Sequence, residues 1–231
     1  MARILLIETS TSLCSVALCE DGRVLSSRQS SQPRSHASMT AVFIKELLGE
    51  QAMLAADLDA VCLSAGPGSY TGLRVGSSTA KGLCFACSIP LLAVGTLEVL
   101  ANQAIENDLV PPEVDRIVPV LDARRMEVYT AVYDACGRAL SEAEAKIIDS
   151  ADCYGSLLQG HNCLFIGDGA AKCSTVFSSE SSRFVQTCPT AMAMATLAFR
   201  EYEMKNFKDC AYFEPFYLKQ FVATQSKKKL F

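Results

Sequence analysis

The sequence predicts an α/β protein made of two similar lobes, and the order of its apolar segments carries this prediction. Short apolar runs typical of strands alternate with segments of helical periodicity along most of the chain. In each half, strands joined by tight turns are followed by a strand, a glycine-bearing turn and a helix. A duplicated α/β lobe with a cleft between the two copies would produce this repeat.

The first lobe is expected over residues 1–110. Its apolar runs predict strands over 3–7, 13–19, 23–29, 59–65 and 91–94, and helices over about 36–49, 71–87 and 97–107. Residues 20–23 form a predicted hairpin turn, and Thr96 is the predicted N-cap of the third helix. Pro111 and Pro112 end that helix and mark the lobe boundary.

The second lobe is expected over residues 111–223. Its apolar runs predict strands over 117–121, 127–133, 138–148 and 163–166, and helices from Ser150, after Gly169, and from Pro189 to about Lys205. Residues 224–231 form a basic tail with lysines at 227–229, for which we expect a solvated segment.

Composition narrows the classes of protein that fit this chain. The net charge of −4 argues against a nucleic-acid surface on this chain alone. No apolar run approaches the length of a membrane span, and the N-terminus does not resemble a signal peptide, so we expect a cytoplasmic protein without membrane contact. The eleven cysteines, Cys84 and Cys87 among them, are expected to be reduced packing residues.

The predicted helix over 71–87 is unusually rich in small residues. Gly72, Gly76 and Ala80 recur every four residues and therefore line one face, while Ser78, Gly82 and Ala86 line a second. Each glycine inside a helix costs about 1 kcal/mol relative to alanine. Something is therefore expected to pack close to this backbone, and a ligand, another element of the chain and another chain are all candidates.

The preceding helix carries two apolar stripes instead of one. Its first stripe consists of Ala37, Ala41, Ile44 and Leu48, and its second of Met39, Phe43 and Leu47. One stripe suffices to cover a sheet. The second stripe predicts that this helix is buried on two sides.

Residues 66–76 carry a resemblance to a known family. They read Gly-Pro-Gly-Ser-Tyr-Thr-Gly-Leu-Arg-Val-Gly, which closely resembles the signature of the TsaB (YeaZ) family of tRNA threonylcarbamoyladenosine biosynthesis proteins. Further segments match that family in order, at 4–10, 95–98, 121–129, 167–169 and 214–219. The resemblance implies the two-lobed actin/hexokinase/Hsp70-like (ASKHA) fold and a cytoplasmic bacterial protein.

The resemblance also implies a role and partners. Members of this family support the paralogue TsaD and the ATPase TsaE, which place a threonylcarbamoyl group on N6 of adenosine 37 in tRNA. The chain is then expected to be a non-catalytic accessory subunit that meets tRNA only through the complex and also pairs with itself. The predicted interface, for TsaD or a second copy, consists of Met39, Phe43, Leu47, Gly72, Arg74, Gly76 and Ala80.

Metal-dependent catalysis is disfavoured by the residues themselves. The paralogue carries two metal-binding histidines where this chain has Thr96 and Leu100, and two ligands four residues apart on one helix face are what such a site needs. His36 and His161, the chain's two histidines, lie far apart in sequence. We therefore expect no metal site and no catalytic residues.

Nucleotide binding is a weaker alternative. Two turns occupy the places where the superfamily grips phosphates, namely Glu8, Thr9 and Ser10 after the first strand, and Gly167, Asp168 and Gly169 in the second lobe. Glu8 stands where the superfamily usually has Asp, which argues against efficient ATP hydrolysis. The alternative function is a nucleotide-binding ATPase or small-molecule kinase of the same superfamily. We expect this chain to require no cofactor of its own. Binding of ATP or ADP at an interface shared with TsaD is left as an alternative.

Overall fold

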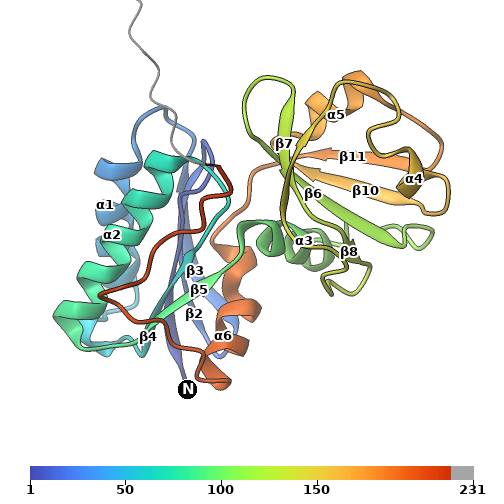
Figure 1. Ribbon diagram of the computed structural model, residues 1–231. Coiled ribbons are helices and arrows are strands. Elements are labelled where there is room, and N and C mark those ends of the chain that lie inside the picture. Colours follow the sequence, from blue (N-terminus) through green and yellow to red (C-terminus); the bar gives the residue numbers. More distant parts are fainter. Residues whose placement is uncertain (220–231) are drawn as a thin grey trace, which may run out of the picture.

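Two mixed β-sheets form the framework of the computed structural model, which describes residues 1–219 (Figure 1). The first sheet has the order β3-β2-β1-β4-β5. Its strands are β1 (Arg3–Glu8), β2 (Cys14–Glu20), β3 (Arg23–Ser30), β4 (Ala60–Ser64) and β5 (Leu91–Val94). Strand β1 pairs antiparallel with β2 and parallel with β4. Its continuous apolar run is explained by this central place, because both faces of the strand are covered.

Helices cover both faces of the first sheet. One face packs against α1 (His36–Glu50) and α2 (Tyr70–Cys87), which lie side by side in Figure 1, with a short 3-10 helix, η1 (Ala55–Asp57), near them. The opposite face packs against α3 (Thr96–Glu106), the 3-10 helix η2 (Met192–Met194) and α6 (Ala195–Glu203).

The second sheet has the order β11-β10-β6-β7-β9, with β8 paired to β6. Its strands are β6 (Arg116–Asp122), β7 (Glu127–Thr130), β8 (Tyr133–Asp134), β9 (Glu144–Ile147), β10 (Cys163–Gly167) and β11 (Ser182–Gln186). Helices α4 (Gly155–Leu158) and α5 (Ala170–Val176) lie over one face, and the other face packs on α3. Helix α3 therefore lies between the two sheets, with Val99 in the core of the first and Leu100 in that of the second.

The segment that returns from the second lobe to the first, residues 187–190, is hydrogen-bonded to α3. The buried amide of Gln103 donates to Thr187 Oγ1 at 3.2 Å and to the Cys188 carbonyl at 3.1 Å, and it accepts from the Thr190 amide at 3.0 Å. A buried amide with this many partners fixes the path of the crossing segment. Both lobes thus pack on α3.

The structure corrects the predicted lobe boundaries. The predicted second lobe ran over 111–223, but Ala193, Met194 and Ala198 pack in the core of the first lobe. The segment after α6 continues along the first lobe. There Lys208 forms an antiparallel backbone β-bridge with Leu91, and the Phe216 amide donates to the Ala65 carbonyl at 2.7 Å. The apolar residues of η2 and α6 complete a sheet face that would otherwise be open. The predicted tail at 224–231, with lysines at 227–229, lies outside the described residues.

Several predicted elements also differ in extent. The expected strand over 138–148 is confined to β9, and the strand over 127–133 splits into β7 and β8. Strand β11 was not predicted because only two apolar residues, flanked by arginine and glutamine, form its apolar run. Thr96 is the first residue of α3 and Gly95 its N-cap. The Thr96 side chain instead shares a 2.7 Å hydrogen bond with Ser64. Among residues 1–219, no helix is both long and apolar enough to cross a bilayer.

Candidate functional site

The small-residue face of α2 packs against the turn that follows β1. The Ser69 amide donates to the Ser10 carbonyl at 2.6 Å, and Thr9 Oγ1 donates to the Gly72 carbonyl at 2.8 Å. A Cβ atom on Gly72 would lie 2.0 Å from the Thr9 carbonyl oxygen, and one on Gly76 would lie 2.4 Å from Thr9 Oγ1. The element that approaches this helix most closely therefore belongs to the same chain.

This packing corrects most of the predicted interface. Phe43, Leu47 and Ala80 are buried in the core of the first lobe, together with strand residues such as Leu5 and Ile7. The second stripe of α1 thus completes the lobe's own core, which it forms together with Ile44 and Leu48 of the first stripe.

The remaining predicted interface residues have different surroundings. Gly72 and Gly76 are in close contact with Thr9 in the turn after β1. Met39 is partly buried against the core of the first lobe. Arg74 is exposed, and its guanidinium lies over the Tyr70 ring at 4.1 Å. Of the seven predicted residues, Arg74 is therefore the one that the structure leaves exposed, with its guanidinium packed on Tyr70 of the same helix.

Both helices nevertheless turn an outward face to solvent. On α1 this face carries Ala37, Ala41 and Val42, whose exposed fraction is 44%. On α2 it carries Gly82, where an added Cβ would meet no atom within 4 Å, and Phe85, which is 86% exposed. Large exposed apolar side chains among small ones are typical of an association surface. We call these five residues the outward face.

Glu8 lies at the end of β1 and is fully buried. Its Oε1 accepts a hydrogen bond from the Ser10 amide at 2.6 Å, whereas Oε2 has no hydrogen-bond partner within the part of the chain that the structure describes. Burial, opposed by the contacts with Ser10, raises the pKa of Glu8 to about 6. The carboxyl group is thus held in the interior instead of being presented to solvent.

This shift predicts a pH-dependent stability. Below the ordinary pKa of 4.5 both folded and unfolded states hold the proton, whereas between 4.5 and about 6 only the folded state does. Stability therefore falls as pH rises through this window, and above it the charged carboxylate costs about 2 kcal/mol. Glu8→Gln keeps the acceptor for Ser10 and removes the charge.

We expect Glu8→Gln to raise the free energy of unfolding by about 2 kcal/mol at pH 8 and to change it little at pH 4.5. Urea unfolding at both pH values measures this difference. An equal effect of the substitution at both pH values would contradict the assigned direction of the pKa shift.

The second predicted loop is built into the second lobe. Gly167 has φ of +140°, and a Cβ there would lie 2.1 Å from the Val120 carbonyl oxygen. The Gly169 amide donates to that same oxygen at 3.0 Å, and Asp168 Oδ1 accepts from the Asp122 amide at 2.8 Å. Burial raises the pKa of Asp168, whose charge also acts on Glu8. Each of the two predicted nucleotide loops is therefore hydrogen-bonded within its own lobe.

The turn between β6 and β7 is flanked by two acids, Asp122 and Glu127. Both are paired with lysines from other segments, Asp122 with Lys172 and Glu127 with Lys219. Neither Arg124 nor Arg125 has an acidic partner among residues 1–219.

Thr96 and Leu100, which the resemblance matched to the paralogue's metal ligands, have other roles. Thr96 is hydrogen-bonded to Ser64, and Leu100 is buried in the core of the second lobe. His36 Nε2 lies 3.0 Å from the Thr11 carbonyl oxygen, and His161 Nδ1 pairs with Asp115 at 2.7 Å. The structure does not bring the two histidines together, and residues 1–219 hold no group of three or more potential metal ligands. All eleven cysteines are free, with Cys84 buried and Cys87 partly exposed.

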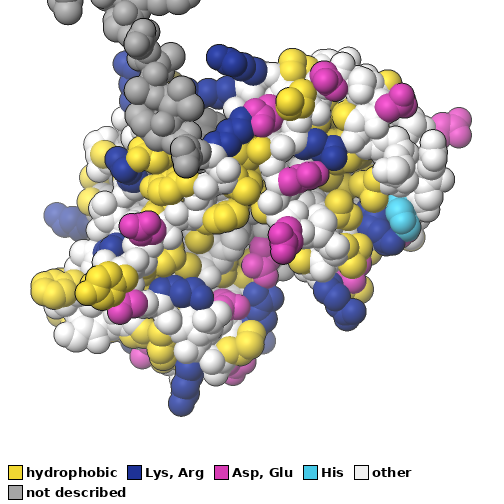
Figure 2. All heavy atoms as spheres, in the orientation of Figure 1, with side chains coloured by type: hydrophobic (Ala, Val, Ile, Leu, Met, Phe, Trp, Pro, Cys, Tyr) yellow, Lys and Arg dark blue, Asp and Glu magenta, His cyan; other side chains and the backbone are white. Residues whose placement is uncertain are grey.

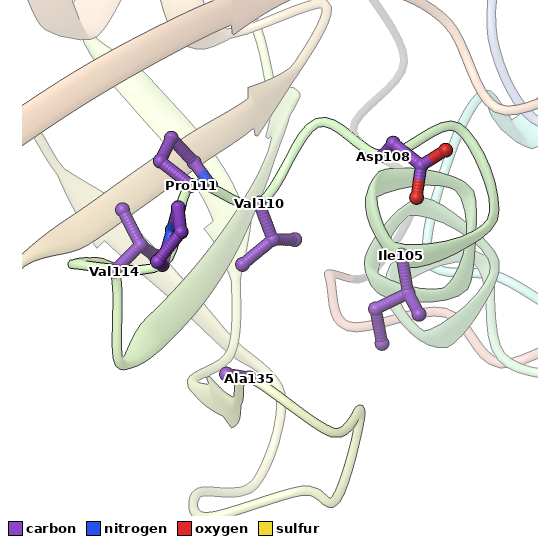
Figure 3. A pocket seen from close by; sticks show the side chains of 7 residues that line it. Ile105, Asp108, Val110, Pro111, Val114 and Ala135 are labelled. Carbon is purple, nitrogen blue, oxygen red and sulfur yellow. The ribbon is translucent and has the colours of Figure 1, made fainter.

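One surface depression lies away from all these residues (Figure 3). It has a volume of about 320 Å³ and lies beside the end of α3, where Ile105 and Asp108 line it together with Val110, Pro111 and Val114 of the connecting segment. Its single acid has no base or nucleophile beside it among the lining residues, so it offers no catalytic arrangement.

Comparisons with known proteins agree with the fold and the motifs. A family model described as TsaD, tRNA N6-adenosine threonylcarbamoyltransferase, matches residues 23–225. The tRNA threonylcarbamoyladenosine biosynthesis protein TsaB of Haemophilus influenzae is 30% identical over 224 residues, which cover 94% of this chain and 93% of that relative.

Two solved structures from Pseudomonas aeruginosa are similar to most of the chain. One is YeaZ, with a TM-score of 0.78, 26% identity and coverage of 94% of this chain and 100% of that chain. The other is described as similar to peptidase YEAZ, with a TM-score of 0.80, 27% identity and coverage of 95% and 100%. These matches confirm the two-lobed α/β fold, and the chain belongs to the TsaB (YeaZ) family within the wider TsaD family of sequences.

Proposed function

We propose that this chain is a non-catalytic accessory subunit for the formation of N6-threonylcarbamoyladenosine in tRNA, where it supports a TsaD-type paralogue and the ATPase TsaE. The names of its relatives supply the pathway. The observation that carries the accessory role is the outward face of α1 and α2, which presents Val42 and Phe85 to solvent beside alanines and Gly82.

The chemistry of this face suits a helical partner. Small side chains allow another helix to approach closely, and an exposed phenylalanine can act as the buried anchor of an interface. A stable interface buries roughly 1,600 Å² in total, and two adjacent helices of four or five turns offer a surface of that order. The same face would serve a TsaD-type paralogue or a second copy of this chain, so the two would compete.

The residues at the expected catalytic positions support an architectural role. Thr96 and Leu100 are not metal ligands of the required kind, and each is used in packing or in a buried hydrogen bond. Glu8 is enclosed in the first lobe and accepts from Ser10. We therefore do not assign to this chain the peptidase activity that the description of one similar structure mentions.

No cofactor is assigned to this chain in the proposed role. Thr9 and Ser10 are bonded to α2 and the turn before it, and Asp168 organises the end of β6. ATP or ADP then binds on the partners or at the surface shared with them, and titration calorimetry of the isolated chain with Mg-ATP tests this. Micromolar binding with turnover would favour the ATPase alternative.

Reconstitution of the tRNA modification tests the proposed function. With the paralogue, the ATPase, tRNA, threonine, bicarbonate, ATP and the enzyme that supplies the activated threonylcarbamoyl group, omission of this chain should reduce modification to background. Adding the chain should restore it. A full rate without the chain would contradict the proposal.

A further inference from the structure

The turn between β6 and β7 holds two arginines in an unfavourable backbone conformation. Arg124 and Arg125 have φ of 66° and 48°, and both are exposed. The left-handed region costs a residue other than glycine about 1–2 kcal/mol, and glycine and asparagine are the residues that adopt it most readily. Two arginines therefore occupy the tip of a turn that glycine or asparagine would make more stable.

The charge of this tip is not neutralised by its neighbours. Asp122 and Glu127, which flank the turn, are paired with Lys172 and Lys219. Figure 2 shows Lys and Arg side chains gathered along the upper edge of the molecule, over the region where Figure 1 places this turn and the start of α2. A chain of net charge −4 thus carries a local cationic surface.

Aromatic rings lie beside two cations of this surface, Lys219 and Arg74. Lys219 Nζ lies 6.0 Å from the centre of the Tyr129 ring. On the same C-terminal segment, the Tyr217 ring lies 4.8 Å from that of Tyr70, over which Arg74 is placed. The segment 217–219 therefore contacts α2 of the first lobe through Tyr217 and β7 of the second lobe through Lys219.

We propose that this surface, formed by Arg74, Tyr129, Tyr217, Lys219 and the Arg124–Arg125 tip, binds unpaired nucleotides of the tRNA substrate. Arginine and lysine contact phosphates, and tyrosine rings stack on unpaired bases, which is the combination that single-stranded RNA requires. The inference rests on the proposed function for the identity of the RNA. It places a tRNA contact on this chain itself, in addition to those that its partners make.

The Arg124→Asn/Arg125→Gly double variant separates binding from folding. It removes both charges and places Asn-Gly at the two left-handed positions, so the fold should be at least as stable as the wild type in thermal unfolding. Arg23→Gln/Arg138→Gln is the matched control, because it removes two exposed arginines that also lack an acidic partner in the described region. All variants are made in the full chain, so the lysines at 227–229 are common to them.

Fluorescence anisotropy with a labelled RNA hairpin that has an unpaired loop measures the affinity between about 50 and 200 mM salt. We expect the tip variant to bind about tenfold more weakly at the lower salt, and its salt dependence to lose about 0.7 in slope for each lost phosphate contact. The control variant should match the wild type, and a fully paired duplex should bind more weakly than the loop.

Equal affinity of the tip variant and the wild type for the loop RNA would overturn the proposal. So would a tip variant that retains RNA binding but no longer associates with the TsaD-type subunit, since the surface would then serve a protein. The binding assay contains no modification step. Dispensability of the chain in the reconstituted reaction would therefore refute the proposed function, whereas unchanged RNA affinity would refute this surface alone.

Discussion

Replacing Gly72 by alanine is expected to lower the free energy of unfolding by about 3 kcal/mol or more, a large part of the roughly 5–15 kcal/mol typical of a folded protein. The added Cβ would lie 2.0 Å from the Thr9 carbonyl oxygen, which is backbone and cannot rotate away. Either α2 or the turn after β1 must move, and the hydrogen bond from Thr9 Oγ1 to the Gly72 carbonyl would be strained as well.

Gly82→Ala is the matched control in the same helix. Its Cβ would meet no atom within 4 Å, so only the better helix propensity of alanine remains. That change should raise stability by up to about 1 kcal/mol. Urea unfolding of both variants gives the comparison. Equal effects of the two substitutions would contradict the close packing of α2 against the turn after β1.

The Val42→Asp/Phe85→Asp double variant is expected to weaken association with the TsaD-type subunit about a hundredfold while the fold stays intact. Both side chains are exposed in the isolated chain, at 44% and 86%, so their loss removes little core packing. In the complex they would be buried, and a carboxylate there would be desolvated without a partner. A hundredfold change corresponds to about 2.7 kcal/mol, within the range of interface hot spots.

Leu140→Asp/Ile147→Asp provides the control for this experiment. Its two apolar side chains are 49% and 60% exposed but belong to the second lobe. Light scattering or sedimentation should show wild-type association for the control and loss of association for the α1/α2 variant. Equal association of both variants would move the interface away from these helices.

The sequence predicted the two-lobed fold because its signals are local. Strands such as β1 are continuous apolar runs, and the helices show clear periodicity, so elements of the first lobe were found within one or two residues of their observed ends. The placement of α6 was missed for a physical reason: nothing local reveals that Ala193, Met194 and Ala198 return to the first sheet. The position of α6 is set by its contacts with strands that lie far away in the sequence.

The candidate site shows the same limit. The spacing of Gly72 and Gly76 correctly predicted a close approach to the helix backbone, but it could not tell Thr9 from another chain. The second stripe of α1 raised the same ambiguity, and Phe43 and Leu47 proved to be core residues. The second small-residue face of α2, with Ser78, Gly82 and Ala86, contains one residue of the outward face, Gly82, but the sequence does not show that this face is exposed and the first is buried. The left-handed arginines of the β6–β7 turn carry no sequence signal for their conformation.

The most direct test of the architectural role is the rate of tRNA modification as a function of the concentration of this chain. For Val42→Asp/Phe85→Asp, we predict that the concentration giving half the maximal rate rises about a hundredfold, while the rate at saturation equals that of the wild type. A lower saturating rate at an unchanged half-maximal concentration would contradict the architectural role, because the chain would then contribute to the reaction itself instead of supporting its partner.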